Sequence, residues 1–175
     1  ALGRAADEIR ADRLGSFVDR SNRLWQRLRQ ESNVDLRQIT MSGTATSRRV
    51  EFPVDVDGAE SGALAVMSQG ELHALGLAVF LPRACAEASP FRFIVVDDPV
   101  QSMDPSKVDG LAEVLRDLAR THQLVVFTHD DRLSAAINRL GVPVTGWEVV
   151  RQDRSDVRVR PRTGDATSPT GVRAG

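Results

Sequence analysis

The chain has 175 residues, of which 41% are apolar and 27% are charged, and its formal net charge is −1. This length and composition predict a globular protein with one sizeable core. The near-neutral charge argues against a surface built mainly to bind nucleic acid, and no apolar run is long enough to cross a membrane.

The spacing of apolar residues predicts one helix over residues 2–31. They recur at alternating intervals of three and four, with Ser21 in the remaining seam position: Leu14, Phe17, Leu24 and Leu28. The pattern covers about two heptads, fewer than the three or four that would establish a coiled coil, so an amphipathic surface helix explains it at least as well.

Two strands are predicted next, over residues 34–41 and 48–56. In the second, every other residue is apolar, as in a half-buried antiparallel strand. Asp57-Gly58 predicts a turn, and residues 58–63 are expected to form a loop of small residues.

From residue 69 onward, predicted helices and strands alternate. The helices cover residues 69–87, 105–120 and 130–140, and the strands between them cover residues 91–97 and 123–128. This alternation predicts a layered α/β fold with a parallel-sheet core and flanking helices.

The last part of the chain is expected to close the sheet and then lose structure. Residues 144–150 and 156–160 are predicted closing strands, and the composition of residues 161–175 predicts a disordered tail. The single cysteine, Cys85, lies in an apolar helical pattern, so we expect it in the core; one unpaired cysteine fits a reducing cytoplasm.

Two adjacent carboxylates end the strand predicted at 91–97. The run Phe93-Ile-Val-Val-Asp97-Asp98-Pro predicts a buried central strand that delivers its acids to the sheet edge where ligands bind. Such a pair suits a magnesium-nucleotide site, because one acid holds the water shell of the ion and the other orients a nucleophilic water. Two solvated aspartates at a strand end would explain the same run.

The helix at 69–87 begins with a second candidate motif. Ser68 and Glu71 fit a capping box, which alone explains the pair. The functional interpretation adds that Gly70 lets a ligand approach the backbone, where the helix start presents amide groups to an anion.

Two further motifs follow. Ser102-Met103-Asp104-Pro105 opens the helix at 105–120, with Asp104 as predicted N-cap and Pro105 as the first helical residue. His129 follows the second apolar strand, beside the Asp97 strand. Most histidines in such places are structural or merely polar, but at this strand end His129 would also be in reach of a bound phosphate. Asp130 is the predicted N-cap of the helix after it.

The order of these motifs resembles the second half of an ABC-type ATPase head. The similarity is to the coiled-coil branch of SMC and double-strand-break-repair ATPases and to related bacterial ATPases, including those attached to anticodon nucleases. Ser68-Gln69-Gly70-Glu71 resembles the signature motif, and residues 93–97 resemble the Walker B strand. Asp98 takes the position of the catalytic acid, Ser102-Met103-Asp104 that of the D-loop, and His129 that of the switch histidine.

The resemblance implies a P-loop NTPase-like α/β fold of which this chain is the C-terminal lobe, incomplete without the N-terminal P-loop half. Residues 1–31 would be the end of a coiled-coil arm or the helix leading into the head, residues 32–160 the lobe, and residues 161–175 the tail. A P-loop needs Gly-x-x-x-x-Gly-Lys-Ser/Thr, but Lys107, the one lysine among 23 basic residues, lies in Pro-Ser-Lys-Val. We therefore expect a piece of a longer protein that does not bind ATP usefully by itself.

The implied activity is ATP hydrolysis between two heads. Asp97 would bind Mg²⁺ chiefly through water, Asp98 would orient the attacking water, and His129 would hold the γ-phosphate. The residues expected to bind nucleotide are Ser68, Gln69, Gly70, Glu71, Ser102 and Asp104.

The implied partners are the P-loop half of the same head and a second head in a homodimer. The resemblance implies a cytoplasmic machine for DNA repair, chromosome maintenance or phage defence, with no membrane partner. The net charge gives no support for DNA binding, so whether DNA is a partner is left open.

Three alternatives stay open. Position 98 is usually glutamate in the family, so the shorter Asp98 also fits a non-catalytic, nucleotide-dependent interaction module. A metal-dependent phosphohydrolase built on His129-Asp130 with Asp97 and Asp98 would need further histidines, and only His73 and His122 remain. An aspartate-phosphorylated receiver leaves the motif at 68–71 unexplained.

Overall fold

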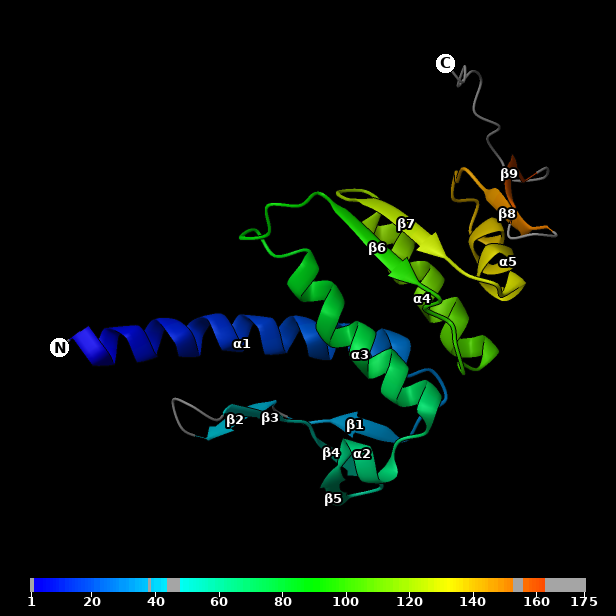
Figure 1. Cartoon of the computed structure of the whole chain (residues 1–175). Coiled ribbons are helices and arrows are strands. Elements are labelled where there is room, and N and C mark those ends of the chain that lie inside the picture. The colour runs from blue at the N-terminus through cyan, green and yellow to red at the C-terminus, as the bar shows by residue number, and fades with distance from the viewer. Residues whose placement is uncertain (1, 38, 44–47, 153–155, 163–175) are drawn as a thin grey trace.

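A long helix opens the chain and leads into the packed part of the molecule. The computed structural model describes residues 2–37, 39–43, 48–152 and 156–162. Helix α1 (Leu2–Leu28) ends three residues earlier than expected, and its N-terminal end extends away from the other elements (Figure 1). Its C-terminal half packs against α3 and α4.

Short antiparallel strands follow α1. Strands β1 (Val34–Leu36) and β4 (Pro53–Val56) pair with each other, as do β2 (Thr40–Gly43) and β3 (Arg48–Glu51). The predicted strands at 34–41 and 48–56 are therefore each divided in two.

The loop predicted over residues 58–63 is wrong. Strand β5 (Ala59–Gly62) pairs with β4, and the short helix α2 (Ala63–Val66) follows it. The predicted turn is present, with positive φ at both Asp57 (52°) and Gly58 (88°). Such a turn returns the chain along β4, and ladder hydrogen bonds then hold small residues in a strand that their side chains do not favour.

The central part of the chain matches the expected alternation. Helix α3 (Gln69–Ala84) is followed by the unit β6 (Phe93–Asp97), α4 (Pro105–Leu118) and β7 (Gln123–Phe127). Strands β6 and β7 pair in parallel, with Asp97 opposite Phe127, and α4 lies on one side of them (Figure 1).

The chain then forms α5 (Asp131–Arg139) and a hairpin of β8 (Trp147–Arg151) and β9 (Val157–Pro161). Among the described residues, β8 and β9 pair only with each other, so the expectation that they close the parallel sheet is wrong. The tail predicted over residues 161–175 lies outside the described residues from residue 163 onward.

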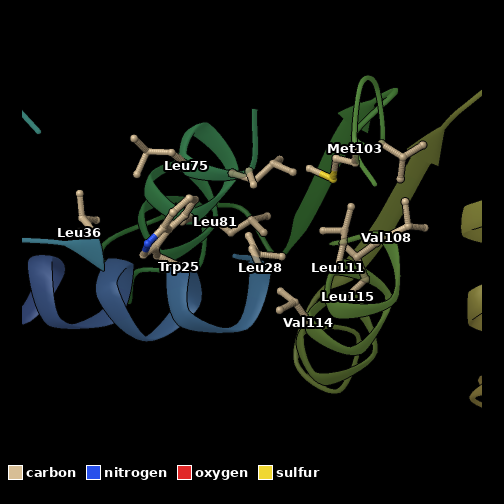
Figure 2. Close-up of a cluster of buried hydrophobic side chains, with 14 of the residues drawn as sticks. Trp25, Leu28, Leu36, Leu75, Leu81, Met103, Val108, Leu111, Val114 and Leu115 are labelled. Atoms are coloured by element: carbon tan, nitrogen blue, oxygen red, sulfur yellow. The ribbon is translucent and has the colours of Figure 1, made fainter. Parts of the chain in front are cut away.

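The core lies where three helices meet. Trp25 and Leu28 of α1 are fully buried, and the indole Nε1 of Trp25 donates to the Val34 carbonyl at 3.2 Å. Figure 2 shows side chains of α1, α3 and α4 converging there, among them Leu75, Leu81, Leu111 and Leu115. Cys85, expected in the core, is only partly buried at its edge, and burial raises the pKa of its thiol.

Helices α1 and α4 approach closely at one glycine. A Cβ on Gly110 would lie 2.5 Å from the carbonyl oxygen of Arg27, which is too close for any side chain. The Arg27 guanidinium also bonds to Asp117 on the next turns of α4, at 2.8 Å. The end of α1 is therefore fixed to α4 both by backbone contact and by an ion pair.

The parallel strands are covered on one face only. Ile94 and Val96 are buried, whereas Phe93, Val95 and Phe127 are 52%, 48% and 53% exposed. The prediction of buried strands is therefore wrong for one of the two faces, because no described element covers it. In the part of the chain that the structure describes, no helix is both long enough and apolar enough to span a membrane.

Candidate functional site

The parallel register of β6 and β7 brings the predicted catalytic residues to one sheet edge. Asp97 lies opposite Phe127, so Asp98 and His129, the residues expected to act on ATP, follow neighbouring strand ends. The carboxyl ends of parallel strands are where ligands bind in open α/β sheets. The pairing predicted from the sequence is thus present in the structure.

Asp98 is held in an uncommon backbone conformation. Its φ is 44°, in the left-handed region that side-chain-bearing residues rarely adopt, and its N–H donates to the Phe127 carbonyl at 2.6 Å. Residues in such conformations persist where the surrounding structure fixes them, and they cluster at functional sites.

The carboxylate of Asp98 is engaged on both oxygens. The Thr128 hydroxyl donates to Oδ1 at 2.9 Å, and Nδ1 of His129 lies 2.8 Å from Oδ2. The Asp98 side chain is 19% exposed, whereas that of His129 is 83% exposed. Asp98 is therefore oriented by its neighbours, and His129 is the more accessible member of the pair.

Asp97 is the residue that suits a metal ion. It is exposed at the end of β6, next to the oriented Asp98. Among the described residues, no three His, Cys, Asp or Glu side chains gather as a metal site of their own. One exposed carboxylate at this sheet edge fits Mg²⁺, which keeps several waters and binds through one or two carboxylates plus substrate phosphates.

The start of α3 forms the predicted capping box. The Ser68 N–H donates to Glu71 Oε2 at 2.8 Å, and the Glu71 N–H donates to the Ser68 hydroxyl at 3.3 Å. The other Glu71 oxygen accepts a hydrogen bond from the Ser32 hydroxyl, just after α1. Burial raises the pKa of Glu71, but these hydrogen bonds outweigh it and hold the pKa below its usual range.

The signature-like and D-loop-like segments touch each other at Gly70. A Cβ on this buried residue would lie 2.2 Å from the carbonyl oxygen of Ser102. Only glycine fits there, so Gly70 has a packing role that the sequence did not indicate. Gln69 and Ser102 are both exposed beside this contact, and Ser102 has a φ of 60°.

The predicted N-cap role of Asp104 is only half right. Asp104 occupies the N-cap position and Pro105 is the first helical residue, but no side-chain bond caps the helix. The carboxylate instead accepts from Nζ of Lys107 at 2.6 Å, and this bond lowers the pKa of Asp104. Lys107 is 4% exposed, so a buried ammonium competes successfully with the backbone amides.

Asp130 caps α5 as predicted. Its carboxylate accepts from the Arg132 N–H at 2.9 Å and from the Arg132 guanidinium, which lowers the pKa of Asp130 to about 2. A depressed folded-state pKa stabilises the fold above the ordinary pKa of aspartate, and this contribution is lost as the pH falls toward 2. At neutral pH the pair is intact.

The candidate residues thus form two groups with contacts inside each. Asp98 and His129 form the first, with Asp97 next to them in the chain. Ser68 and Glu71 bond to each other in the second, where Gly70 between them lies against Ser102. The same short loop, residues 98–104, joins the two.

Four contacting residues were not predicted from the sequence: Ser32, Lys107, Thr128 and Arg132. Thr128 could have been predicted, because it lies directly before His129 in the sequence. Lys107 attracted attention only as a lysine outside a P-loop. Ser32 and Arg132 gave no signal, because their partners lie 39 and 29 residues away in the chain.

A comparison with protein families shows which family the chain belongs to. A family described as "AAA domain, putative AbiEii toxin, Type IV TA system" matches residues 3–135. The chain belongs to this AAA-domain family. In sequence it is similar to Rad50 proteins, and in fold it is similar to SMC heads.

Curated relatives of this AAA-domain chain are DNA-repair proteins. The "DNA double-strand break repair Rad50 ATPase" of Methanopyrus kandleri is 37% identical over 78 residues, covering 42% of this chain. "DNA repair protein rad-50" of Caenorhabditis elegans is 24% identical over 156 residues, covering 77% of this chain. The chain spans only 9% and 12% of the length of these two relatives.

Solved structures share the fold of this AAA-domain chain. The Smc head domain with a coiled coil and joint from Pyrococcus yayanosii has a TM-score of 0.71 at 16% identity; the match covers 91% of this chain and 29% of that one. A structure described under "ATP-driven dimerization and DNA stimulated activation of SMC ATPases" has a TM-score of 0.69 at 16% identity, with 89% of both chains covered. The fold is therefore that of an SMC head-like α/β P-loop NTPase.

Proposed function

We propose that this chain is the C-terminal lobe of an ATP-hydrolysing head that completes its site with a P-loop lobe and a second head. The observation that carries the proposal is the contact of Asp98 with Thr128 and His129, at the sheet edge that also holds Asp97. An oriented carboxylate beside an accessible imidazole is the arrangement that phosphoryl transfer from ATP to water needs.

Each residue at this edge has a distinct role in the proposal. Asp97 would hold Mg²⁺, and the ion would supply positive charge for the phosphate oxygens. His129, which is 83% exposed, turns from Asp98 to the γ-phosphate. This movement frees Oδ2 of Asp98 to accept a hydrogen bond from the attacking water, while Thr128 still fixes Oδ1. The Thr128 bond thus compensates for the side chain that is one methylene shorter than glutamate.

The second group of residues faces the nucleotide bound by the other head. Ser68, Gln69 and the amide groups at the start of α3 receive its γ-phosphate, because a helix start attracts an anion. Glu71 closes the capping box and Ser102 and Asp104 shape the adjoining loop. Phosphoryl transfer depends mainly on positioning and electrostatics, so the site acts only when both heads are in place.

The uncovered face of β6 and β7 supports the proposed P-loop partner. Phe93, Val95 and Phe127 expose about half of their side chains on it. Soluble monomers rarely leave such apolar faces open, and an N-terminal lobe of the same head would cover this one. Helix α1 would continue as the coiled-coil arm between the two lobes.

The proposed process is DNA repair, chromosome maintenance or phage defence. It rests on the Rad50 relatives and on the family described by a putative AbiEii toxin. ATP-driven dimerisation and stimulation by DNA, named for one solved SMC ATPase, are proposed for this chain as part of a homodimer.

ATP hydrolysis by the full-length protein, with and without Asp98→Asn, tests the proposal. We expect tight Mg-ATP binding by the full-length protein and none by these 175 residues alone, measured by calorimetry. D98N should lower kcat by about 10²–10³-fold while leaving Mg-ATP binding intact, because it removes the acceptor that orients water. Asp109→Asn is the matched control, because it removes an exposed carboxylate of α4 that pairs with Arg139 of α5 and lies outside the site.

A low rate that D98N leaves unchanged would favour the other interpretation, a non-catalytic module that uses ATP only to hold partners together. Tight Mg-ATP binding by these residues alone would contradict the assignment of the missing P-loop lobe.

A further inference from the structure

The side chain of Arg132 joins two loops that are distant in the sequence. It lies in the first turn of α5, three residues after His129. Its Nη1 donates to the carbonyl oxygen of Met103 at 2.7 Å, while Nε donates to the Asp130 carboxylate at 2.9 and 3.0 Å. The guanidinium is planar with donors in fixed directions, so these bonds set both loops in one geometry.

Each end of this bridge is held by a further contact. Met103 is 3% exposed, so its backbone is anchored in the core. Asp130 is anchored as the N-cap of α5 through the Arg132 N–H. A shift of the D-loop backbone at Met103 therefore moves Arg132 and Asp130 with it.

The bridge completes a ring of contacts around the catalytic pair. From Asp98 the chain runs through the D-loop to Met103, the guanidinium connects Met103 to Asp130, and the adjacent His129 contacts Asp98 at 2.8 Å. The D-loop also carries Ser102, whose carbonyl rests against Gly70. Any movement of the start of α3 thus reaches the ring through the D-loop.

Capping of α5 by Asp130 and Arg132 does not by itself require the bond from Arg132 to Met103. Asp130 and Arg132 are two residues apart, and an exposed ion pair of that kind contributes little to stability. The bond to a backbone carbonyl 29 residues earlier in the chain is the part that capping leaves unexplained.

We propose that Arg132 is a positioning residue that makes the placement of His129 against Asp98 depend on the D-loop. The inference rests on the proposed function and deepens it. When the D-loop is pressed by a second head, the bond from Arg132 to Met103 transmits the displacement to the segment of His129.

The test uses the full-length protein and three variants. Arg132→Gln removes the guanidinium but keeps part of its stem, and Arg132→Lys keeps one charged donor. Arg139→Gln is the matched control, because it breaks an ion pair between α5 and Asp109 of α4 without touching the D-loop. The measurements are kcat and KM for Mg-ATP, and amide hydrogen exchange over residues 98–104 and 127–131.

R132Q should lower kcat by about ten- to a hundred-fold with KM changed by less than about two-fold, because positioning is lost and nucleotide binding is not. R132K should recover part of kcat, and R139Q should match the parent protein. Exchange should accelerate in both segments for R132Q and in neither for R139Q.

The inference is overturned if R132Q changes kcat no more than R139Q does, or if faster exchange is confined to the first turn of α5. If the parent protein hydrolyses no ATP, the proposed function fails, and the exchange data alone still decide whether Arg132 links the loops. Should R132Q not fold, Asp130→Asn replaces it: its amide oxygen still caps α5. An unchanged exchange rate over residues 98–104 in D130N would then reject the link.

Discussion

At the scale of single residues, the backbone conformation of Asp98 and the missing side chain of Gly70 set the geometry of the site. Asp98 adopts a φ of 44°, accepts a hydrogen bond from Thr128 on one carboxylate oxygen and contacts His129 with the other. Gly70 places its backbone directly against the Ser102 carbonyl. The first feature orients the carboxylate to which we assign the catalytic role, and the second joins two motifs that the sequence presents as separate.

Gly70→Ala should destabilise the chain and disturb the D-loop. The new Cβ would lie 2.2 Å from the Ser102 oxygen, and relieving such a contact by moving backbone costs about 1–3 kcal/mol. The free energy of unfolding in urea measures this loss.

Gly76→Ala in the same helix is the control, since nothing lies within 4 Å of its Cβ position. There alanine should stabilise the helix by about 0.5–1 kcal/mol. Equal unfolding free energies for the two variants would contradict the packing role of Gly70.

At this scale, the sequence predicted which strand ends lie side by side, but it did not predict the contacts between distant loops. Asp98 and His129 were predictable as neighbours, because both follow apolar runs that must pair in parallel. The Glu71–Ser32 and Arg132–Met103 bonds were not, because they depend on how loops from distant parts of the chain meet.

At the scale of the elements, α1 packs against α3 and α4 along one part of its length, and its N-terminal end extends away from the other elements (Figure 1). The seam predicted from Leu24, Leu28 and Ser21 is packed on α3 and α4, and it also includes Trp25, which the seven-residue pattern did not predict. The periodicity was thus correct, but it indicates a helix packed against the head as much as an arm that leaves it.

Leu28→Ala should reveal how far the head depends on α1. Leu28 is fully buried, and removing such a side chain costs about 2–5 kcal/mol of the free energy of unfolding. Arg23→Ala, on the exposed side of the same helix, should change it by less than about 0.5 kcal/mol. Equal, small changes in thermal or urea unfolding would mean that α1 folds apart from the head.

Local signals were less reliable for the strands than for the helices. Residues 58–63 have no strand propensity, yet β5 forms there because the turn at Asp57-Gly58 brings it alongside β4. Pairing partners decide such strands, and a partner close in space is not visible in local composition.

At the scale of the whole molecule, the two faces of the parallel strands differ in what covers them. The face with Ile94 and Val96 is buried, and the face with Val95 and Phe127 is about half exposed. A sequence of apolar residues predicts a strand covered on both faces, but it does not say whether both covers belong to the same chain.

Val95→Thr with Phe127→Thr should make the isolated chain less prone to aggregate. Threonine suits a strand and removes apolar surface from the open face. Light scattering against protein concentration measures the effect. The fold should persist in this variant, whereas Ile94→Thr, on the buried face, should unfold the chain. Unaltered scattering would show that the open face does not drive association.

The contact between Gly110 and the Arg27 carbonyl has a mechanical consequence. With the two backbones in direct contact and Arg27 bonded to Asp117, the last turns of α1 and the middle of α4 form one stiff body. Tension applied to the N-terminal end of α1 is transmitted directly into α4, because no side chain lies between the two backbones at this contact. It reaches the first turn of α4, where Lys107 holds Asp104, so a pull on the helix is a load on the loop that follows Asp98.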